Sequence, residues 1–406
     1  MYVRAPLVVL RRPSLGLAAS AMLIGTVVWL RWSSLDRSSF CDFNVYARGG
    51  TAILRGESLY DVTVRGLPFT YSPFAAELFT PLSSVPIEIA RALFTVGSLA
   101  CYVAIVFVCA RSARIGLLLG CIVGAAGLAL EPFFTNIFFG QINLYLILMV
   151  TLDCLVMPAR YRGWLVGLAA GIKIVPGAFV LYFALKRDWP AVWRMVAGFA
   201  VSVACGALVA PTDSWRYWSG GFMDVRRFGA DVTLRADNQS LSAELIRLTH
   251  DVNPSKVASV ALPVFALLVA VLVAKRQLDA ERPLEAMVAL GLGSVLASPI
   301  SWTHHWLWVI PLLVVTVSRR WWLTSWALGV VFLIGPMWQV PMGQFKELNQ
   351  SWWQATLCAS YVLFGVGMLG RLLFVQRWPT SGATVSICRE SSSAGIRVPS
   401  DIFNSV

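Results

Sequence analysis

Two polar stretches among the long apolar runs of this chain carry residues that could do chemistry. Lys173 stands in GIKIVPG, inside an apolar segment that runs from 163 to 185. An ammonium group inside a membrane is costly unless it faces an anion, another polar group or water. His304 and His305 stand side by side in SPISWTHHW (298–306), and they are two of only three histidines in the chain. A lysine and a histidine that meet would suit the binding of a phosphate group.

Each of these residues also has a purely structural interpretation. Lys173 could pair with another side chain of the protein or extend toward the cytoplasm. Adjacent residues of a helix point about 100° apart, so His304 and His305 should not both face one site. Both could instead lie among the neighbouring tryptophans in an interfacial aromatic belt. The sequence leaves these alternatives open.

The composition indicates a polytopic membrane protein. Of the 406 residues, 57% are hydrophobic and only 13% are charged, which is too little polar surface for a soluble protein of this size. The 17 Trp are typical of interfacial anchors, and the net charge of +12 fits cytoplasmic loops and anionic headgroups. Because no basic stripe with interleaved aromatics is present, we expect no nucleic-acid partner. No obligate protein partner is evident either.

Apolar stretches of about 20 residues predict about ten full membrane spans and an all-α fold. The predicted spans are 14–31, 90–110, 115–131, 133–157, 190–210, 256–274, 284–300, 304–318, 321–340 and 352–374. The positive-inside rule places the basic pairs between spans in the cytoplasm. Because segment 163–185 has basic clusters at both ends, we interpret it as a re-entrant pair of short helices that breaks at IKIVPG.

This topology places two long loops, 32–89 and 211–255, on the non-cytoplasmic face together with the SPISWTHH corner. Loops of this length are usually functional or disordered. Both mix aromatic residues with Arg, Asp and Asn, so we expect ordered loops over a polar site. Residues 1–376 should form a single transmembrane domain, and 377–406 a polar, disordered cytoplasmic tail.

Six motifs follow one another over residues 40–310: CDFNVY, FTYSPF, GQINLYL, GIKIVPG, NQSLSA and SPISWTHHW. Together they resemble the actinobacterial polyprenyl-phosphate-mannose-dependent mannosyltransferases of glycosyltransferase family 87, which have the GT-C membrane fold. The resemblance implies a bundle of the GT-C type, a lipid-linked sugar donor, and chemistry on the periplasmic face of the bacterial plasma membrane. It also implies that no metal is required.

Within that family, the chain is most similar to members that add an α-1,2-linked mannose to phosphatidylinositol mannosides. Related members that elongate lipomannan or arabinomannan, with mannose or arabinose, are alternatives. The sequence is consistent with a reaction that requires no metal. No DxD motif stands near the predicted site, and no cluster of residues has metal-ligand spacing. We therefore expect no metal and no other cofactor.

The GT-C pattern implied by the resemblance has a catalytic carboxylate shortly after the first span, where Asp42 stands. Transfer from a β-linked mannosyl phosphate to an α product inverts the anomeric carbon. It needs one base for the proton of the acceptor hydroxyl, while the phosphate leaves without an acid. One carboxylate suffices, unlike the pair of an inverting hydrolase. Asp61, in the turn-like YDVTV, is the rival, and Asp42 could merely cap a helix.

The other candidate site residues fall into two groups, those that could bind the sugar donor and those that could bind the acceptor. For the donor phosphate the candidates are Lys173, His304, His305, Arg226, Arg227 and Arg235. For the acceptor and its sugar hydroxyls they are Tyr71, Gln141, Asn143, Asn238 and Gln239. Polar residues in spans more often bond neighbouring helices, and the arginines could simply lie near anionic lipid.

A transporter or flippase is the main alternative of another class. Broken helices and ionisable residues inside the membrane are also transporter features. Against this interpretation, the sequence has no two-fold repeat, and its candidate ionisable residues gather on one face of the predicted membrane domain.

Overall fold

The computed structural model describes residue 25 and residues 39–224, 229, 231–251 and 256–374. These residues are helical apart from loops and one antiparallel hairpin, β1 (Thr63–Val64) with β2 (Leu67–Pro68). The compact unit to which they belong ends at Phe374. The predicted first span (14–31), apart from residue 25, and the predicted tail (377–406) lie outside the described residues.

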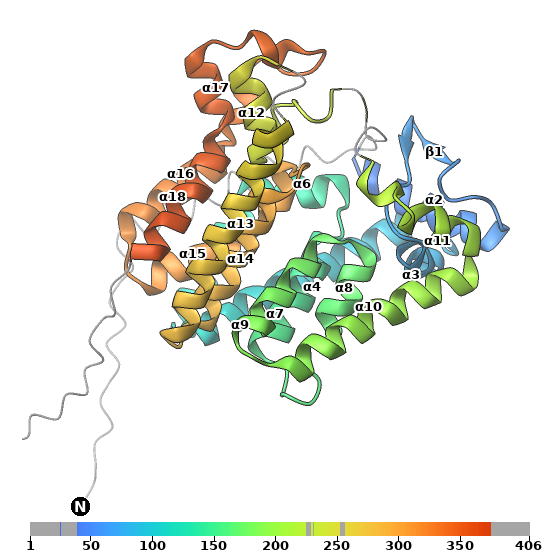
Figure 1. The fold of residues 1–406 in the computed structure, drawn as a ribbon, viewed down its shortest axis with the longest axis horizontal. Coiled ribbons are helices and arrows are strands. Elements are labelled where there is room, and N and C mark those ends of the chain that lie inside the picture. The colour runs from blue at the N-terminus through green and yellow to red at the C-terminus, as the bar shows by residue number, and fades with distance from the viewer. Residues whose placement is uncertain (1–24, 26–38, 225–228, 230, 252–255, 375–406) are drawn as a thin grey trace, which may run out of the picture. The chain divides into compact units, whose positions relative to one another are not determined.

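The first half of the chain forms helices of very different lengths. They are α2 (Cys41–Arg55), α3 (Pro73–Ser83), α4 (Ile87–Ser112), α5 (Leu117–Leu128), α6 (Glu131–Phe139), α7 (Asn143–Leu155), α8 (Trp164–Ile172), η1 (Val175–Phe179), α9 (Val180–Leu185), α10 (Trp189–Val209), α11 (Pro211–Trp218) and η2 (Gly221–Met223). Helix α8 packs along α10, and α2 packs against α3 (Figure 1).

The second half begins with the short α12 and ends with α18. Its helices are α12 (Leu241–Thr249), α13 (Lys256–Asp279), α14 (Pro283–Ala297), η4 (Thr303–Trp308), α15 (Val309–Ser318), α16 (Trp322–Ile334), η5 (Pro336–Gln339), η6 (Lys346–Asn349), α17 (Trp352–Cys358) and α18 (Ser360–Phe374). Helices α13 and α14 run side by side (Figure 1).

Three described helices are long and apolar enough to cross a membrane: α4, α10 and the part of α13 from Val260 to Asp279. Two bent pairs, α5 with α6 at 62° and α17 with α18 at 63°, bring the number to five if each pair is one span. Other apolar helices have only 10–17 residues. The protein is therefore an all-helical membrane protein, but these helices do not confirm the predicted ten full spans. Hydropathy measures apolar length and does not register a bend.

Rows of exposed apolar side chains mark the surfaces that suit contact with lipid tails. On α4 they include Leu93, Val96 and Phe107, whose exposed fractions are 55%, 65% and 56%. On α13, Phe265 and Leu268 are similarly exposed, at 64% and 61%. Apolar surface of this extent is unusual on a soluble protein, and in a bilayer it meets hydrocarbon.

Helix α7 lies where two hydrophobic cores meet. The larger core is built on α14 and α15 and includes Leu144 and Ile147 of α7. The smaller core surrounds α2 and α3, is rich in aromatic rings, and includes Ile142 and Leu146. The polar residues at the start of α7 therefore stand at the junction of the two cores.

The segment from 163 to 185 is broken, as the sequence predicts. Helix α8 ends at Ile172, and Lys173 takes an extended conformation with φ −142° and ψ 128°. The chain resumes in η1, which contains Pro176, and continues into α9. Proline cannot donate a backbone hydrogen bond, and it disfavours helix at the preceding residue. The break places the Lys173 side chain at a helix end instead of on a continuous lipid-facing helix.

Candidate active site

Asp42 lies in the first turn of α2, and its carboxylate faces the turn between α6 and α7. Gln141 Nε2 donates a hydrogen bond of 2.6 Å to Asp42 Oδ2. Gly140, just before Gln141, has a φ of 68°, and a Cβ there would lie 2.6 Å from Phe43 Cβ. Glycine therefore lets the turn adopt its backbone and approach α2 closely enough to bring Gln141 to Asp42.

Two tyrosines complete the surroundings of Gln141. The Tyr46 hydroxyl donates to Gln141 Oε1 at 2.8 Å, and it lies 2.8 Å from the Tyr71 hydroxyl. The Tyr71 hydroxyl also lies 3.2 Å from Gln141 Oε1. Gln141 and Tyr71, which the sequence offers for sugar binding, are thus bonded to the immediate neighbours of Asp42.

Opposing effects act on the pKa of the Asp42 carboxyl. Burial raises this pKa above its ordinary value. The hydrogen bond from Gln141 and the positive charge of Lys173 lower it, without cancelling the effect of burial. A partly desolvated carboxylate with a raised pKa is a stronger base than an exposed one, which suits proton abstraction.

Lys173 contacts neutral groups. Its Nζ donates to Asn143 Oδ1 at 3.1 Å, lies 2.9 Å from His305 Nε2, and stands 5.6 Å from the centre of the Tyr71 ring. Among the described residues no carboxylate forms an ion pair with this ammonium group. Its hydrogen-bonding geometry is therefore fixed while its charge is left without a direct counter-ion.

Of the adjacent histidines, His305 is the one bonded to Lys173. An ammonium group can only donate, so His305 Nε2 accepts and the proton of the neutral ring lies on Nδ1. His304 is 4% exposed, and its ring packs edge-on against Phe139 and His305. The two histidine ring centres are 4.8 Å apart and the ring planes are nearly perpendicular, at 88°.

Asn143 and Asn136 fix the polar start of α7. Asn143 Nδ2 donates to Asn136 Oδ1 and to the His304 carbonyl oxygen, both at 3.2 Å. Asn136 Nδ2 donates to the Gln141 carbonyl oxygen at 3.2 Å. Because its own Oδ1 accepts from Lys173, the Asn143 amide joins the lysine, the histidine segment and α6.

A cavity opens beside Lys173 and changes in character along its wall. Its polar lining residues are Asn143, Lys173, Ser294, Ser298, Ser301 and His305. Its apolar lining residues are Leu146, Ile147, Val150, Val175, Pro176, Phe179, Val295 and Trp308. Along α7 the lining passes from Asn143 to aliphatic side chains within two turns. The cavity therefore offers a polar group for an anion and an apolar wall for a hydrocarbon.

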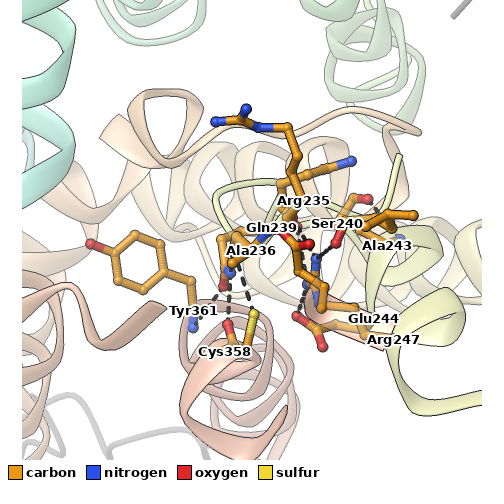
Figure 2. Close-up of polar contacts among 12 residues, drawn as sticks. Arg235, Ala236, Gln239, Ser240, Ala243, Glu244, Arg247, Cys358 and Tyr361 are labelled. Atoms are coloured by element: carbon orange, nitrogen blue, oxygen red, sulfur yellow. Dashed lines mark hydrogen bonds and ion pairs between the residues drawn. The ribbon is translucent and has the colours of Figure 1, made fainter. Parts of the chain in front are cut away.

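Asn238 and Gln239 lie in a buried network, and their side-chain amides bond backbone groups. Asn238 Oδ1 accepts from the Ser301 amide at 2.8 Å, and Gln239 Nε2 donates to the Cys358 carbonyl oxygen at 2.7 Å. Figure 2 shows Gln239 between Ala236, Cys358 and Tyr361. Both residues are fully buried. In this arrangement they hold the second loop to the histidine segment.

The basic candidates of the second loop differ in their positions. Arg226 and Arg227 lie outside the described residues. Arg235 forms two hydrogen bonds of 2.9 Å with the Asp237 carboxylate, and its guanidinium lies 5.7 Å from the centre of the Trp302 ring. Its charge is therefore already neutralised.

The rival carboxylate lies elsewhere on the surface. Asp61 is exposed and forms an ion pair of 2.7 Å with Arg216. That pairing lowers the pKa of the Asp61 carboxyl, which makes it a weaker base than Asp42.

Comparison with known proteins shows the family of this chain. The model of glycosyltransferase family 87 matches residues 69–299. The chain belongs to this family. A polyprenol-phosphate-mannose-dependent α-(1-2)-phosphatidylinositol mannoside mannosyltransferase of Mycobacterium tuberculosis is 30% identical, over 88% of this chain and 92% of its own. The protein of the same description from Mycolicibacterium smegmatis is 32% identical, over 86% and 87%.

A third relative, also from Mycolicibacterium smegmatis, is described as a phosphatidylinositol pentamannoside mannosyltransferase. It is 30% identical to this chain over 89% of the chain and 92% of its own length. No solved structure matches the chain. Within the family 87 match lie Tyr71, Gln141 and Lys173, whereas Asp42 and His305 lie outside its limits.

Sequence reasoning missed two residues of this candidate site. Tyr46 ends the CDFNVY motif and no role was predicted for it, although it is four residues after Asp42 on the same face of α2. Asn136 stands beside Thr135 in the otherwise apolar FFTNIFF, which was a detectable signal.

Proposed function

We propose that this protein transfers mannose from polyprenyl-phosphate mannose to a phosphatidylinositol mannoside, forming an α-1,2 linkage with inversion. The observation that carries the proposal is the presence of two charged groups in one site. One is the partly buried carboxylate of Asp42. The other is the ammonium group of Lys173, which has no direct counter-ion and stands beside a cavity with an apolar wall. The names of the relatives supply the donor and the acceptor class.

In the proposed reaction Asp42 is the base. The acceptor hydroxyl oxygen forms a bond to the anomeric carbon as the bond from that carbon to the phosphate oxygen breaks. Asp42 takes the hydroxyl proton, and polyprenyl phosphate leaves as an anion that needs no proton. The hydrogen bond from Gln141 holds one carboxylate oxygen, Oδ2, which leaves Oδ1 for the acceptor.

Lys173 is proposed to bind the donor phosphate. An ammonium group has three protons, and the contacts with Asn143 and His305 use two of them. The third is available for a phosphate oxygen, and a phosphodiester supplies the missing negative charge. His305 then acts by orienting the lysine, because its Nε2 accepts from Nζ. The apolar wall of the cavity is proposed to take the first isoprene units.

The acceptor glycan is proposed to lie on the side of the histidine segment that carries Trp302. This half-buried indole has the paired side chains Arg235 and Asp237 beside it. An aromatic face flanked by charged hydrogen-bonding groups suits a sugar ring, whose C–H face packs on the indole while its hydroxyls bond the charges. We place this site on the periplasmic face of the plasma membrane. The basic clusters lie at the other ends of the helices, and the positive-inside rule favours a cytoplasmic location for those ends.

The proposal is tested with the purified full chain in lipid nanodiscs. Radiolabelled polyprenyl-phosphate mannose is supplied with a phosphatidylinositol mannoside, and the product is digested with an α-1,2-specific mannosidase. We expect a mannolipid one residue larger that the mannosidase returns to the starting acceptor. Transfer of arabinose from polyprenyl-phosphate arabinose, with no transfer of mannose, would point to the arabinan branch of the family and contradict the proposal.

A further inference from the structure

We propose that Tyr46 and Tyr71 are positioning residues for Asp42, and that they act by fixing the direction of the Gln141 amide. The inference rests on the proposed role of Asp42 as the base. It concerns two hydroxyl groups that neither the sequence motifs nor the relatives assign to catalysis.

The Gln141 amide has two different ends, an oxygen that accepts hydrogen bonds and a nitrogen that donates them. Only the nitrogen can bond an ionised carboxylate, and it does so with Asp42 at 2.6 Å. If the amide turned over, its oxygen would face the carboxylate and repel it. The reactive geometry of Asp42 therefore depends on which way this amide points.

The two phenols decide that direction. They lie on the oxygen side of the amide, at 2.8 Å for Tyr46 and 3.2 Å for Tyr71, and a phenol can donate to Oε1. An inverted amide would offer them only N–H groups, so neither phenol could keep its hydrogen bond to the amide oxygen. The phenols therefore favour the amide orientation that bonds Asp42, because only that orientation presents an oxygen to them.

Packing holds both phenols in place. Tyr46 and Tyr71 are 1% and 9% exposed, so water has little access to replace their hydroxyls. The Tyr46 ring stacks on Phe79 at 4.7 Å between centres and meets the Tyr71 ring edge-on at 5.0 Å. The Tyr60 hydroxyl donates to the Tyr71 carbonyl oxygen at 2.9 Å, which anchors the backbone of the FTYSPF motif.

Each phenol can substitute in part for the other. The two hydroxyls have one proton each for three contacts: Tyr46 with Gln141, Tyr71 with Gln141, and Tyr46 with Tyr71. When one hydroxyl is lost, the other still has a proton for Gln141 Oε1. The inference therefore predicts that single Tyr→Phe changes are mild and that the double change is severe.

The experiment compares Tyr46→Phe, Tyr71→Phe, their double variant and Gln141→Met in the full chain. Tyr102→Phe is the matched control, because Tyr102 is a buried phenol bonded to a backbone carbonyl, that of Gly124, away from the site. We expect kcat to fall less than about threefold in each single variant and by about 10- to 100-fold in the double variant, since small misplacement of a reacting group can cost about 10²-fold. The KM values for donor and acceptor should stay near those of the wild type.

The pH profile separates positioning from a structural role. Without the N–H bond to Asp42, the acid limb of kcat/KM should move to higher pH in the double variant and in Gln141→Met. Adding Tyr46→Phe and Tyr71→Phe to Gln141→Met should cause no further loss, because the phenols act through Gln141. A folded double variant with wild-type kcat and an unmoved acid limb overturns the inference. A further loss in the Gln141→Met background overturns it too.

Two further results keep this inference distinct from the proposed function. If the double variant does not fold, Gln141→Met alone decides, because it removes the bond to Asp42 and leaves both phenols. If Asp42→Asn retains wild-type transfer, the proposed base is wrong and the inference fails with it. If Asp42→Asn is inactive while Gln141→Met is fully active with an unmoved acid limb, the base is retained and only the inference fails.

Discussion

Arg162 and Asp188, which lie just before and just after segment 163–185, form an ion pair of 2.8 Å. The two ends of this apolar segment therefore meet, and both lie on one side of any membrane that contains it. A helix that crossed once would separate its ends by the thickness of the bilayer, about 30 Å. This contact is the geometry that the re-entrant interpretation requires.

Cysteine labelling tests the sidedness of this segment in cells. Tyr161→Cys and Trp189→Cys place thiols at exposed positions beside the ion pair without removing it. In a background without the native cysteines, both should react only after the cytoplasmic side is opened to a membrane-impermeant maleimide. Thr63→Cys, in the exposed β1 hairpin, serves as the reference for the opposite side. Labelling of positions 161 and 189 from different sides would rule out the re-entrant pair.

Asp42→Asn tests the base. The amide keeps the shape of the side chain but cannot accept a proton, so transfer should fall by at least about 10²-fold, the lower range for a general base. Asp61→Asn is the matched control, because Asp61 is exposed and pairs with Arg216. It should retain nearly all activity. A folded Asp42→Asn variant with more than about a tenth of wild-type transfer would exclude Asp42 as the base.

The raised pKa of Asp42 predicts how activity and stability depend on pH. The base must be ionised, so kcat/KM should fall as the pH drops through this pKa, above the value of about 3.9 for an exposed Asp. A carboxyl whose pKa is higher in the folded than in the unfolded state stabilises the fold below its unfolded pKa, and this contribution is lost as the pH rises through the folded pKa. At pH 7 the neutral Asp42→Asn variant should therefore unfold at a Tm equal to or above that of the wild type. A clearly lower Tm would show that the ionised carboxylate is stabilising.

Lys173→Met tests the phosphate contact. It removes the charge but keeps an unbranched side chain, and a charged hydrogen bond contributes about 1.5–3 kcal/mol. The donor KM should rise roughly ten- to hundredfold while the acceptor KM changes little. Lys275→Met is the control, since Lys275 is exposed and pairs with Asp279. Equal effects on donor and acceptor would assign Lys173 a structural role.

Arg247 should be essential for folding of the second loop. Its side chain is fully buried, pairs with Glu244, and donates to the carbonyl oxygens of Leu234, Arg235 and Asn238 (Figure 2). Arg247→Leu leaves Glu244 buried without its partner, which typically costs about 3–5 kcal/mol. Thermal unfolding should detect this loss, whereas Arg276→Leu, at an exposed position of α13, should leave the Tm nearly unchanged.

The sequence predicts the parts of this protein that depend on local chemistry. Lys173 was singled out because a charge in an apolar segment needs a partner, and the break in the helix was predicted from Pro176 and the basic ends of the segment. Asp42 was found through a motif. In each of these cases, one short stretch of sequence contains the feature from which the prediction was made.

The sequence does not predict features that depend on distant contacts. Nothing near Tyr46 indicates that its hydroxyl meets Gln141, which is 95 residues away. Asn238 and Gln239 were assigned to sugar because they are polar, yet their amides bond backbone groups of segments 60 to 120 residues further on. The number of full spans could not be predicted for a related reason, since a bend of 62° between α5 and α6 leaves the hydropathy unchanged.

Lys173 and His305 are in contact although they are 132 residues apart in the sequence. This separation determines when their contact can form during synthesis of the chain. A nascent chain inserts Asp42, Gln141 and Lys173 into the membrane long before residue 305 leaves the ribosome. Until the later segment packs back, Asn143 is present to accept a hydrogen bond from Lys173, but His305 is not. Translation products that end before residue 305 therefore lack the contact between Lys173 and His305, and under our proposal their phosphate site is incomplete.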